Sequence, residues 1–89
     1  MKIIMNLEVS KGCSTWKEAF LNNEDNRQRH KVKVLAYDHE EGNENRVHAV
    51  LEIPSIETMQ EMLKDPDMIK KRENAGVIVE TQKMIKLVE

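Results

Sequence analysis

The chain has 89 residues, enough for one domain and too few for a second hydrophobic core. Its 14 basic and 16 acidic residues give a formal net charge of −2, which creates no overall attraction to nucleic acid or to an anionic membrane. The single cysteine, Cys13, excludes an internal disulfide and a multi-cysteine metal site. The apolar opening stops at Asn6, and no run reaches the roughly 18 apolar residues of a membrane span. We therefore expect one cytoplasmic domain over residues 1–89.

Residues 2–9 are predicted to form a first strand because apolar and polar side chains alternate along them. A helix is expected to follow, with Thr15 as its N-cap and with Trp16 and Phe20 on one face. Residues 22–31 contain no aliphatic or aromatic side chain, which predicts an exposed helix end or a loop. In the first predicted strand, residues 2–9, one face carries Ile3, Met5, Leu7 and Val9.

Residues 32–53 organise the rest of the chain, because they predict a β-hairpin. Two alternating segments, 32–39 and 46–53, flank residues 40–45, which are rich in Glu, Gly and Asn and suit a turn. The alternation places Tyr37 on the side of its strand that faces away from the core. The side predicted to face the core carries Val32, Val34 and Ala36.

The C-terminal part predicts a helix with an interruption and then a strand. Pro54 ends the hairpin, and Ser55 is a suitable N-cap for a helix. Asp65 and Pro66 predict that a new helix starts there, as N-cap and first helical residue. Residues 77–88 form the last predicted strand, where consecutive apolar residues indicate burial on both sides or a bulge.

This order predicts an α+β fold of the ferredoxin-like βαββαβ type, with a four-stranded antiparallel sheet and two helices on one face. The helix-free face would expose an apolar patch of Ile4, Leu35, Tyr37 and Val50 ringed by charge. Such a patch favours a homodimer that pairs through this face. RNA-binding proteins of this fold need outward aromatic residues on the first and third strands, and none occurs here, so no nucleic-acid partner is expected.

Few residues point to chemistry. Trp16 and Phe20 either fill the space between helix and sheet or form walls of a pocket for a flat or apolar ligand. His30, His39 and His48 titrate near neutrality, but no carboxylate lies at a spacing that requires pairing with them. His39 and His48 approach each other across the hairpin, yet no third ligand is evident, so neither a metal nor a cofactor is predicted.

The chain resembles the dimeric α+β barrel superfamily, which includes antibiotic-biosynthesis-type monooxygenases and stress-responsive barrel proteins. The resemblance rests on the element order, on Trp16, Phe20 and His30, and on the strand at 47–53. It implies a homodimer with paired sheets and a ligand pocket between helices and sheet. Cofactor-free monooxygenases of this group use Asn, Trp and His side chains in that pocket, for which Asn6, Trp16 and His30 are the nearest candidates.

We therefore expect a small homodimeric protein that binds a small ligand, with no catalysis assigned. The candidate ligand-binding residues are Trp16, Phe20, His30 and Tyr37. One alternative is a cofactor-independent monooxygenase-like enzyme acting on a small aromatic or apolar substrate. Another is a regulatory adaptor that binds a partner protein through a sheet edge. The identity of the ligand and of the partner is left open.

Overall fold

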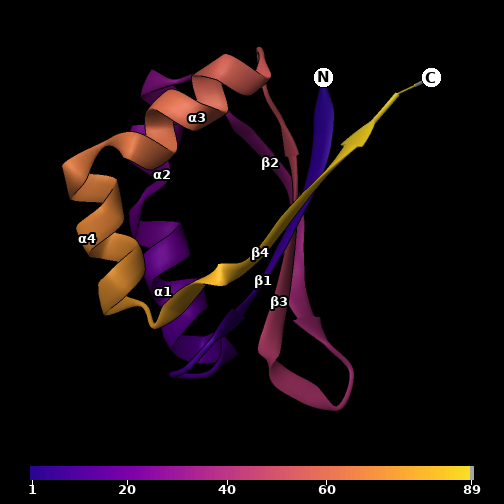
Figure 1. The fold of residues 1–89 in the computed structure, drawn as a ribbon, viewed down its shortest axis with the longest axis vertical. Coiled ribbons are helices and arrows are strands. Elements are labelled where there is room, and N and C mark those ends of the chain that lie inside the picture. Colours follow the sequence, from indigo (N-terminus) through magenta and orange to yellow (C-terminus); the bar gives the residue numbers. More distant parts are fainter. Residues whose placement is uncertain (89) are drawn as a thin grey trace.

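The computed structural model describes residues 1–88, in which the helices lie against one face of a four-stranded sheet (Figure 1). The elements in chain order are β1 (Lys2–Val9), α1 (Cys13–Asn22), α2 (Glu24–Arg29), β2 (Lys33–Glu40), β3 (Asn43–Glu52), α3 (Ile56–Lys64), α4 (Pro66–Asn74) and β4 (Val77–Leu87). No helix in the described part of the chain is long and apolar enough to cross a membrane.

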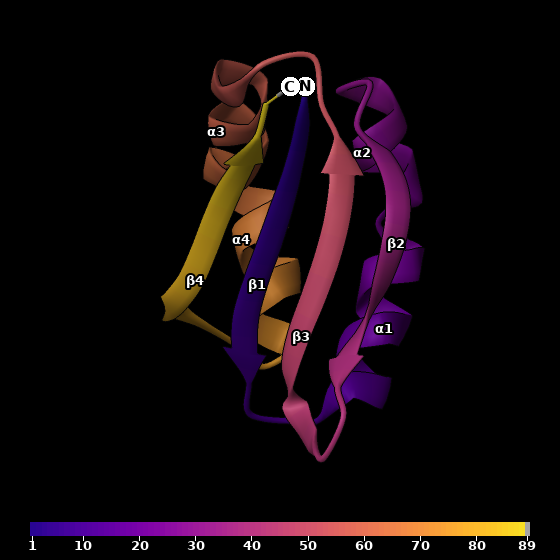
Figure 2. The ribbon, with the colours of Figure 1, turned by 90° about the vertical axis from the view of Figure 1, so that its right-hand side faces the viewer.

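The sheet has the strand order β2-β3-β1-β4, and its neighbouring strands are antiparallel. β1 therefore occupies a central place, as its lack of proline and glycine allows. Figure 2 shows the opposite face of the sheet, with all four strands in front and the helices behind them. The predicted α+β, ferredoxin-like architecture is confirmed.

The core lies between the helices and the inner face of β1 and β3. The predicted alternation holds in both strands, since Ile3, Leu7, Val47, Ala49 and Leu51 are all buried. Two methionines of α3 complete the core from the helical side, Met59 and Met62. Each fully buried apolar side chain stabilises the fold by about 1.5–3 kcal/mol, so this layer dominates the favourable side of folding.

A β-bulge at Leu35 changes the orientation of half of β2. Val34 pairs with Leu51 and Ala36 pairs with the next residue of β3, Val50, so Leu35 is an extra residue. The alternation reverses after it, and Tyr37 stands opposite the buried Ala49. The predictions that Tyr37 faces away from the helices and that Ala36 faces the core are therefore wrong, because one inserted residue exchanges the two faces of a strand.

The polar segment after α1 is folded and partly buried. It forms α2, where Asn26 and Arg27 are buried, so the expectation of an exposed run is wrong. Lys31 adopts φ 57 and ends the helix, while the Val32 N–H donates to the Arg27 carbonyl at 2.9 Å. Helix α1 also starts earlier than predicted, because Gly12 and not Thr15 is its N-cap residue.

The predicted helix starts in the C-terminal half are confirmed. The Ser55 hydroxyl accepts a hydrogen bond from the Thr58 N–H at 3.2 Å, and the Asp65 carboxylate accepts one from the Asp67 N–H at 2.9 Å. Pro66 occupies the first turn of α4, as predicted.

Strand β4 contains the bulge that its doubled apolar residues indicated. Its register against β1 shifts between Asn6 and Glu8, which pair with Lys83 and Ile78 respectively. The Thr81 hydroxyl lies in the shifted segment and accepts a hydrogen bond from the Glu8 N–H at 2.8 Å. The hairpin turn is shorter than predicted, since Glu40 and Asn43 already pair across it.

Candidate functional site

A cavity of ≈ 60 Å³ lies between the helices and the sheet. Trp16 and Phe20 of α1 form one wall, and core residues of β1 and β3 form its floor. Four of the lining residues are flexible methionines, namely Met5, Met59, Met62 and Met68. By volume the cavity exceeds the roughly 10–15 Å³ that one water molecule needs, and methionine side chains adapt readily to an apolar guest.

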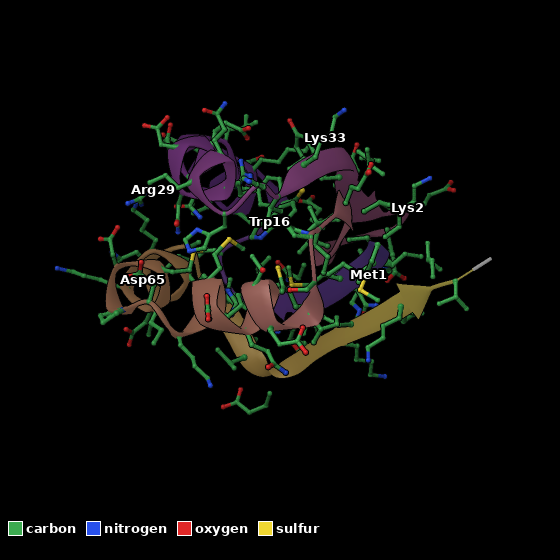
Figure 3. All side chains as sticks on the ribbon, turned by 90° about the horizontal axis from the view of Figure 1, so that it is seen from above. Met1, Lys2, Trp16, Arg29, Lys33 and Asp65 are labelled. Carbon is green, nitrogen blue, oxygen red and sulfur yellow. The ribbon has the colours of Figure 1, made fainter. Side chains whose placement is uncertain are left out.

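The wall of the cavity is an aromatic cluster. The rings of Trp16 and Phe20 are stacked, with centroids 4.8 Å apart, and the ring of Tyr37 lies 5.2 Å from Phe20 and 6.3 Å from Trp16. Trp16 points into the space between the helices and the sheet in Figure 3. Tyr37 packs behind the other two rings and is not among the residues that line the cavity. The bulge at Leu35 therefore creates this cluster by turning Tyr37 toward α1.

His30 is the C-cap residue of α2 and is not among the residues that line the cavity. Its Nδ1 atom is 2.9 Å from the Asn26 carbonyl oxygen. A carbonyl oxygen can only accept a hydrogen bond, so Nδ1 is the donor in this contact.

One end of the cavity is polar, and α2 and α4 supply its polar groups. Arg27 is only 3% exposed, stacks its guanidinium 4.1 Å from the centre of the Phe20 ring, and forms an ion pair with Glu24 at 2.9 Å. The amide of Asn23 donates to the Met68 sulfur at 2.9 Å, and its oxygen accepts from Lys71 at 3.4 Å. These contacts satisfy polar groups that would otherwise be costly to bury.

Arg72 also lines the cavity, from the C-terminal half of α4. Its guanidinium donates a hydrogen bond to the Gln82 amide oxygen of β4. Burial lowers the pKa of Arg72, because the charged form loses hydration there.

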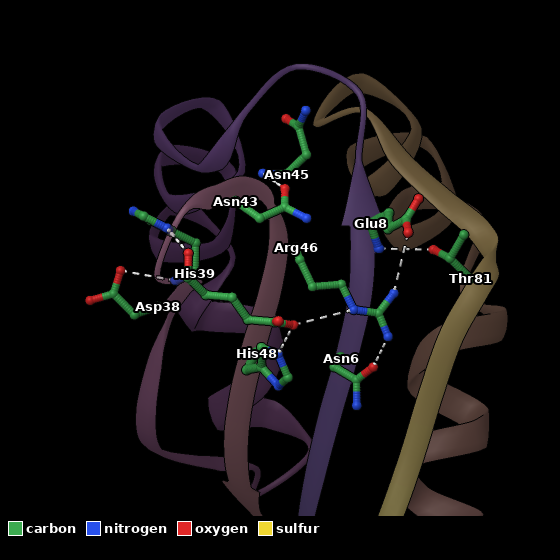
Figure 4. A network of polar contacts seen from close by, with 10 residues as sticks. Asn6, Glu8, Asp38, His39, Asn43, Asn45, Arg46, His48 and Thr81 are labelled. Atoms are coloured by element: carbon green, nitrogen blue, oxygen red, sulfur yellow. Dashed lines mark hydrogen bonds and ion pairs between the residues drawn. The ribbon is translucent and has the colours of Figure 1, made fainter.

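A second polar network lies on the helix-free face of the sheet (Figure 4). Arg46 donates to the Asn6 side-chain oxygen and lies 3.7 Å from Glu8 and 3.6 Å from Glu40. The Nε2 atom of His48 lies 2.7 Å from the Glu40 carboxylate. Asn6 therefore stands on the opposite side of the sheet from Trp16 and the cavity, and the structure does not bring Asn6, Trp16 and His30 together.

A third cluster joins the β1–α1 connection to the end of β2. Potential metal-ligand atoms of Cys13, Asp38 and His39 lie within 4.8 Å of one another. Protein groups already bind two of them: Asp38 pairs with Lys17 at 3.2 Å, and the His39 Nδ1 lies 2.8 Å from the Glu40 carbonyl. Burial raises the pKa of the Cys13 thiol, and the His39 N–H and Lys17 lower the pKa of Asp38.

Sequence reasoning missed the polar end of the cavity. Asn23, Asn26 and Arg27 recur at helical spacing, and this period was the available signal that one face of a polar helix is buried. Lys71 and Arg72 also line the cavity, and their position there depends on how α4 packs on the sheet.

Solved structures with the same element order and sheet topology show that this chain shares their α+β fold. SnoaB of Streptomyces nogalater, a cofactor-independent oxygenase, matches 99% of this chain over 92% of its own, with a TM-score of 0.65 and 7% identity. A candidate antibiotic biosynthesis monooxygenase of Bordetella bronchiseptica matches 99% of this chain over 96% of its own, with a TM-score of 0.71 and 12% identity. A NIPSNAP family protein of unknown function from Agrobacterium tumefaciens matches 93% of this chain over 81% of its own, with a TM-score of 0.66 and 12% identity.

No protein-family model matches the sequence, and the search of curated proteins finds no match. At such low sequence identities, the structural similarity shows the fold alone. One fold can host several activities, so the function has to be argued from the cavity and the surfaces of this chain.

Proposed function

We propose that this protein is a small homodimer that binds a small, largely apolar ligand in the cavity between its helices and its sheet. The single observation that carries the proposal is the composition of that cavity, where two stacked aromatic rings and four methionines surround unfilled volume. Proteins pack their interiors closely, so unfilled space beside flexible side chains is a feature of ligand-binding sites more than of plain cores.

Filling the cavity tests this proposal. Ala19 lines it from α1, and Ala19→Leu would place three additional carbon atoms in the free volume. Wild-type protein should bind neutral aromatic probes such as benzamide and 1-naphthamide, with a saturable change in the emission of Trp16, the only tryptophan. Ala19→Leu should lose this binding. Glu18→Leu, the same residue type introduced on the exposed side of α1, is the matched control and should retain it. Binding by Ala19→Leu equal to wild type would refute the proposal.

The helix-free face supports the homodimer. It carries apolar side chains beside the network around Arg46, and the paired registers of β1 with β3 and β4 place them on one side. Ile85 is 50% exposed and Leu87 is 41% exposed in the isolated chain. The apolar side chains of this face are Ile4, Val50, Ile78, Ile85 and Leu87. An apolar surface of this kind is what a second copy would cover.

A charge placed on this face should dissociate the dimer. Ile85→Glu should give the mass of one chain by size exclusion with light scattering at micromolar concentration, whereas wild type gives the mass of two. Ile69→Glu is the matched control, because Ile69 is 51% exposed but lies on α4, in the helical layer. A wild-type protein that stays a single chain at these concentrations would exclude the homodimer.

A second candidate function is cofactor-independent oxygenation of a small aromatic substrate. The fold shared with SnoaB favours it, together with the cationic groups at the polar end of the cavity, which would stabilise the anion of a phenol. Oxygen uptake with one-ring phenols tests it. If phenols whose binding is detected by Trp16 emission cause no oxygen uptake above the rate without protein, oxygenation is excluded and ligand binding remains the proposed function.

A further inference from the structure

All charged residues that line the cavity are cations. They are Arg27, Lys71 and Arg72, and no aspartate or glutamate among residues 1–88 joins them in the lining. The rest of the lining is apolar except for Asn23. Charges beside an apolar cavity are normally paired, because removing them from water is costly. The positive sign of the charges in the lining therefore bears on the charge of the ligand that enters the cavity.

Two of the three cations already have a carboxylate partner. The Nε and Nη2 atoms of Arg27 donate to one oxygen of Glu24 at 3.2 and 2.9 Å. Lys71 lies 3.1 Å from the Asp67 carboxylate, one turn earlier in α4. Both pairs are short-range contacts within a helix, so each of these cations is neutralised by its own element.

Arg72 differs from the other two. Its hydrogen bond goes to the neutral amide of Gln82, and within the described chain no carboxylate lies within 4.0 Å of its guanidinium nitrogens. The loss of hydration lowers the pKa of Arg72, and no neighbouring acid offsets this effect. A guanidinium has five N–H donors, so one bond to Gln82 leaves donors for a planar, bidentate anion.

We propose that the ligand of this cavity is an apolar acid, whose ring or branched hydrocarbon part packs among Trp16, Phe20 and the methionines and whose carboxylate binds Arg72. This inference rests on the proposed function, since it names the class of molecule for the same cavity. A carboxylate supplies the missing negative charge and accepts two parallel hydrogen bonds from the guanidinium. Lys71 also lines the cavity and adds a second positive charge to it.

The volume limits the size of the acid. The cavity of ≈ 60 Å³ is smaller than the engineered cavity of about 150 Å³ that accommodates benzene. A ring therefore enters only when methionine side chains move, which their three rotatable bonds permit. Acids with one ring or a short branched chain fit these dimensions better than large polycyclic molecules.

A pair of probes with the same shape and different charge tests the inference. Benzoate and benzamide are titrated into wild-type protein, with Trp16 emission and calorimetry as readouts. Benzoate should bind at least about tenfold more tightly, because a hydrogen bond to a charged group contributes more than one to a neutral group. Arg72→Met keeps the apolar stem and removes the charge, and it should abolish the preference of the protein for benzoate over benzamide.

Two further variants make the result specific to Arg72. Arg29→Met removes an exposed guanidinium of α2 outside the cavity lining, and it should leave both affinities unchanged. Arg72→Lys retains the charge and should keep part of the benzoate preference, and it decides the question if Arg72→Met does not fold. Equal binding of benzoate and benzamide by wild type would overturn this inference and leave the ligand-binding proposal standing. Failure of both probes and of their naphthalene analogues to bind would overturn the ligand-binding proposal itself.

Discussion

Truncation of Met59 offers the sharpest test of the packing between helices and sheet. Met59 is 0% exposed and lines the cavity from α3. Met59→Ala removes three heavy atoms beyond Cβ, and at about 0.8 kcal/mol per methylene equivalent the lost transfer free energy is about 2 kcal/mol. The vacated space adjoins the existing cavity, so we expect little collapse. If about 50 Å³ stays empty, about 24 cal/mol per Å³ adds about 1 kcal/mol.

The expected cost of Met59→Ala is therefore about 3 kcal/mol of the free energy of unfolding. For a domain of this size, that corresponds to a fall of about 12–24 °C in Tm. Urea denaturation followed by Trp16 emission and by circular dichroism measures it, and the slope with denaturant should stay constant. Met59→Leu conserves the volume and should cost less than about 1.5 kcal/mol.

Met84→Ala is the matched control for the same atoms in a different environment, because Met84 is 36% exposed on β4. It should change the free energy of unfolding by no more than about 0.5 kcal/mol. The enlarged cavity of Met59→Ala should also bind benzene, and saturating benzene should recover part of the lost stability. Equal costs for Met59→Ala and Met84→Ala would refute the assignment of Met59 to the core beside a cavity.

Three local predictions use the same denaturation assay. Ser55→Ala removes the N-cap hydrogen bond of α3 and should cost about 1 kcal/mol. Lys31→Gly should stabilise the protein by up to about 1 kcal/mol, because Lys31 has φ 57 at the end of α2 and glycine adopts this conformation without strain. Gly76→Ala should destabilise the protein. Gly76 has φ 81, and a Cβ there would lie 2.9 Å from side chains of the β1–α1 connection. The pKa of Asp38 is lowered by the His39 N–H and by Lys17. The charged form of Asp38 therefore stabilises the fold at pH values above the usual aspartate pKa. This stabilisation is lost as the pH falls through the lowered pKa. Asp38→Asn should therefore be less stable than wild type near neutral pH and equal to it at about pH 2.

Specific results would contradict each of these. Unchanged stability of Ser55→Ala would mean that the α3 cap is formed by other groups. A destabilised Lys31→Gly would indicate that the lysine side chain makes contacts that outweigh its backbone strain. A stability difference between Asp38→Asn and wild type that persists at about pH 2 would show that the carboxylate charge is not its origin.

The starts of α3 and α4 and the strand pattern of β1 and β3 could be predicted because their signals are local. Ser55 and Asp65 cap helices through bonds to residues two or three positions away. In β3 the buried residues Val47, Ala49 and Leu51 alternate with half-buried neighbours, and in β1 the alternation buries Ile3, Leu7 and Val9, although Asn6 is buried as well. The resemblance to α+β barrel proteins rested on the order of these elements, and the architecture agrees with it.

The orientation of Tyr37 could not be predicted in the same way. Nothing in the composition of residues 33–40 marks Leu35 as an extra residue, because a bulge is a property of two paired strands. His30 was a ligand-binding candidate from the sequence pattern, and it is not among the residues that line the cavity. The burial of Arg27 is likewise a tertiary effect, since it depends on Phe20 and Glu24 being within reach.

The sequence by itself determined the layers of this protein: the alternation along β1 and β3, where α3 and α4 start, and that two aromatic residues share a helical face. These follow from backbone hydrogen bonding and apolar period within a few neighbouring residues. Only the tertiary structure decided that a bulge turns Tyr37 onto those aromatics, that Asn6 lies on the other face of the sheet, and that Arg27, Lys71 and Arg72 converge on one cavity. These charges come from α2 and α4, and their approach to one cavity depends on how the two helices pack on the sheet. The spacing of residues along the chain does not determine how far apart two separate helices lie.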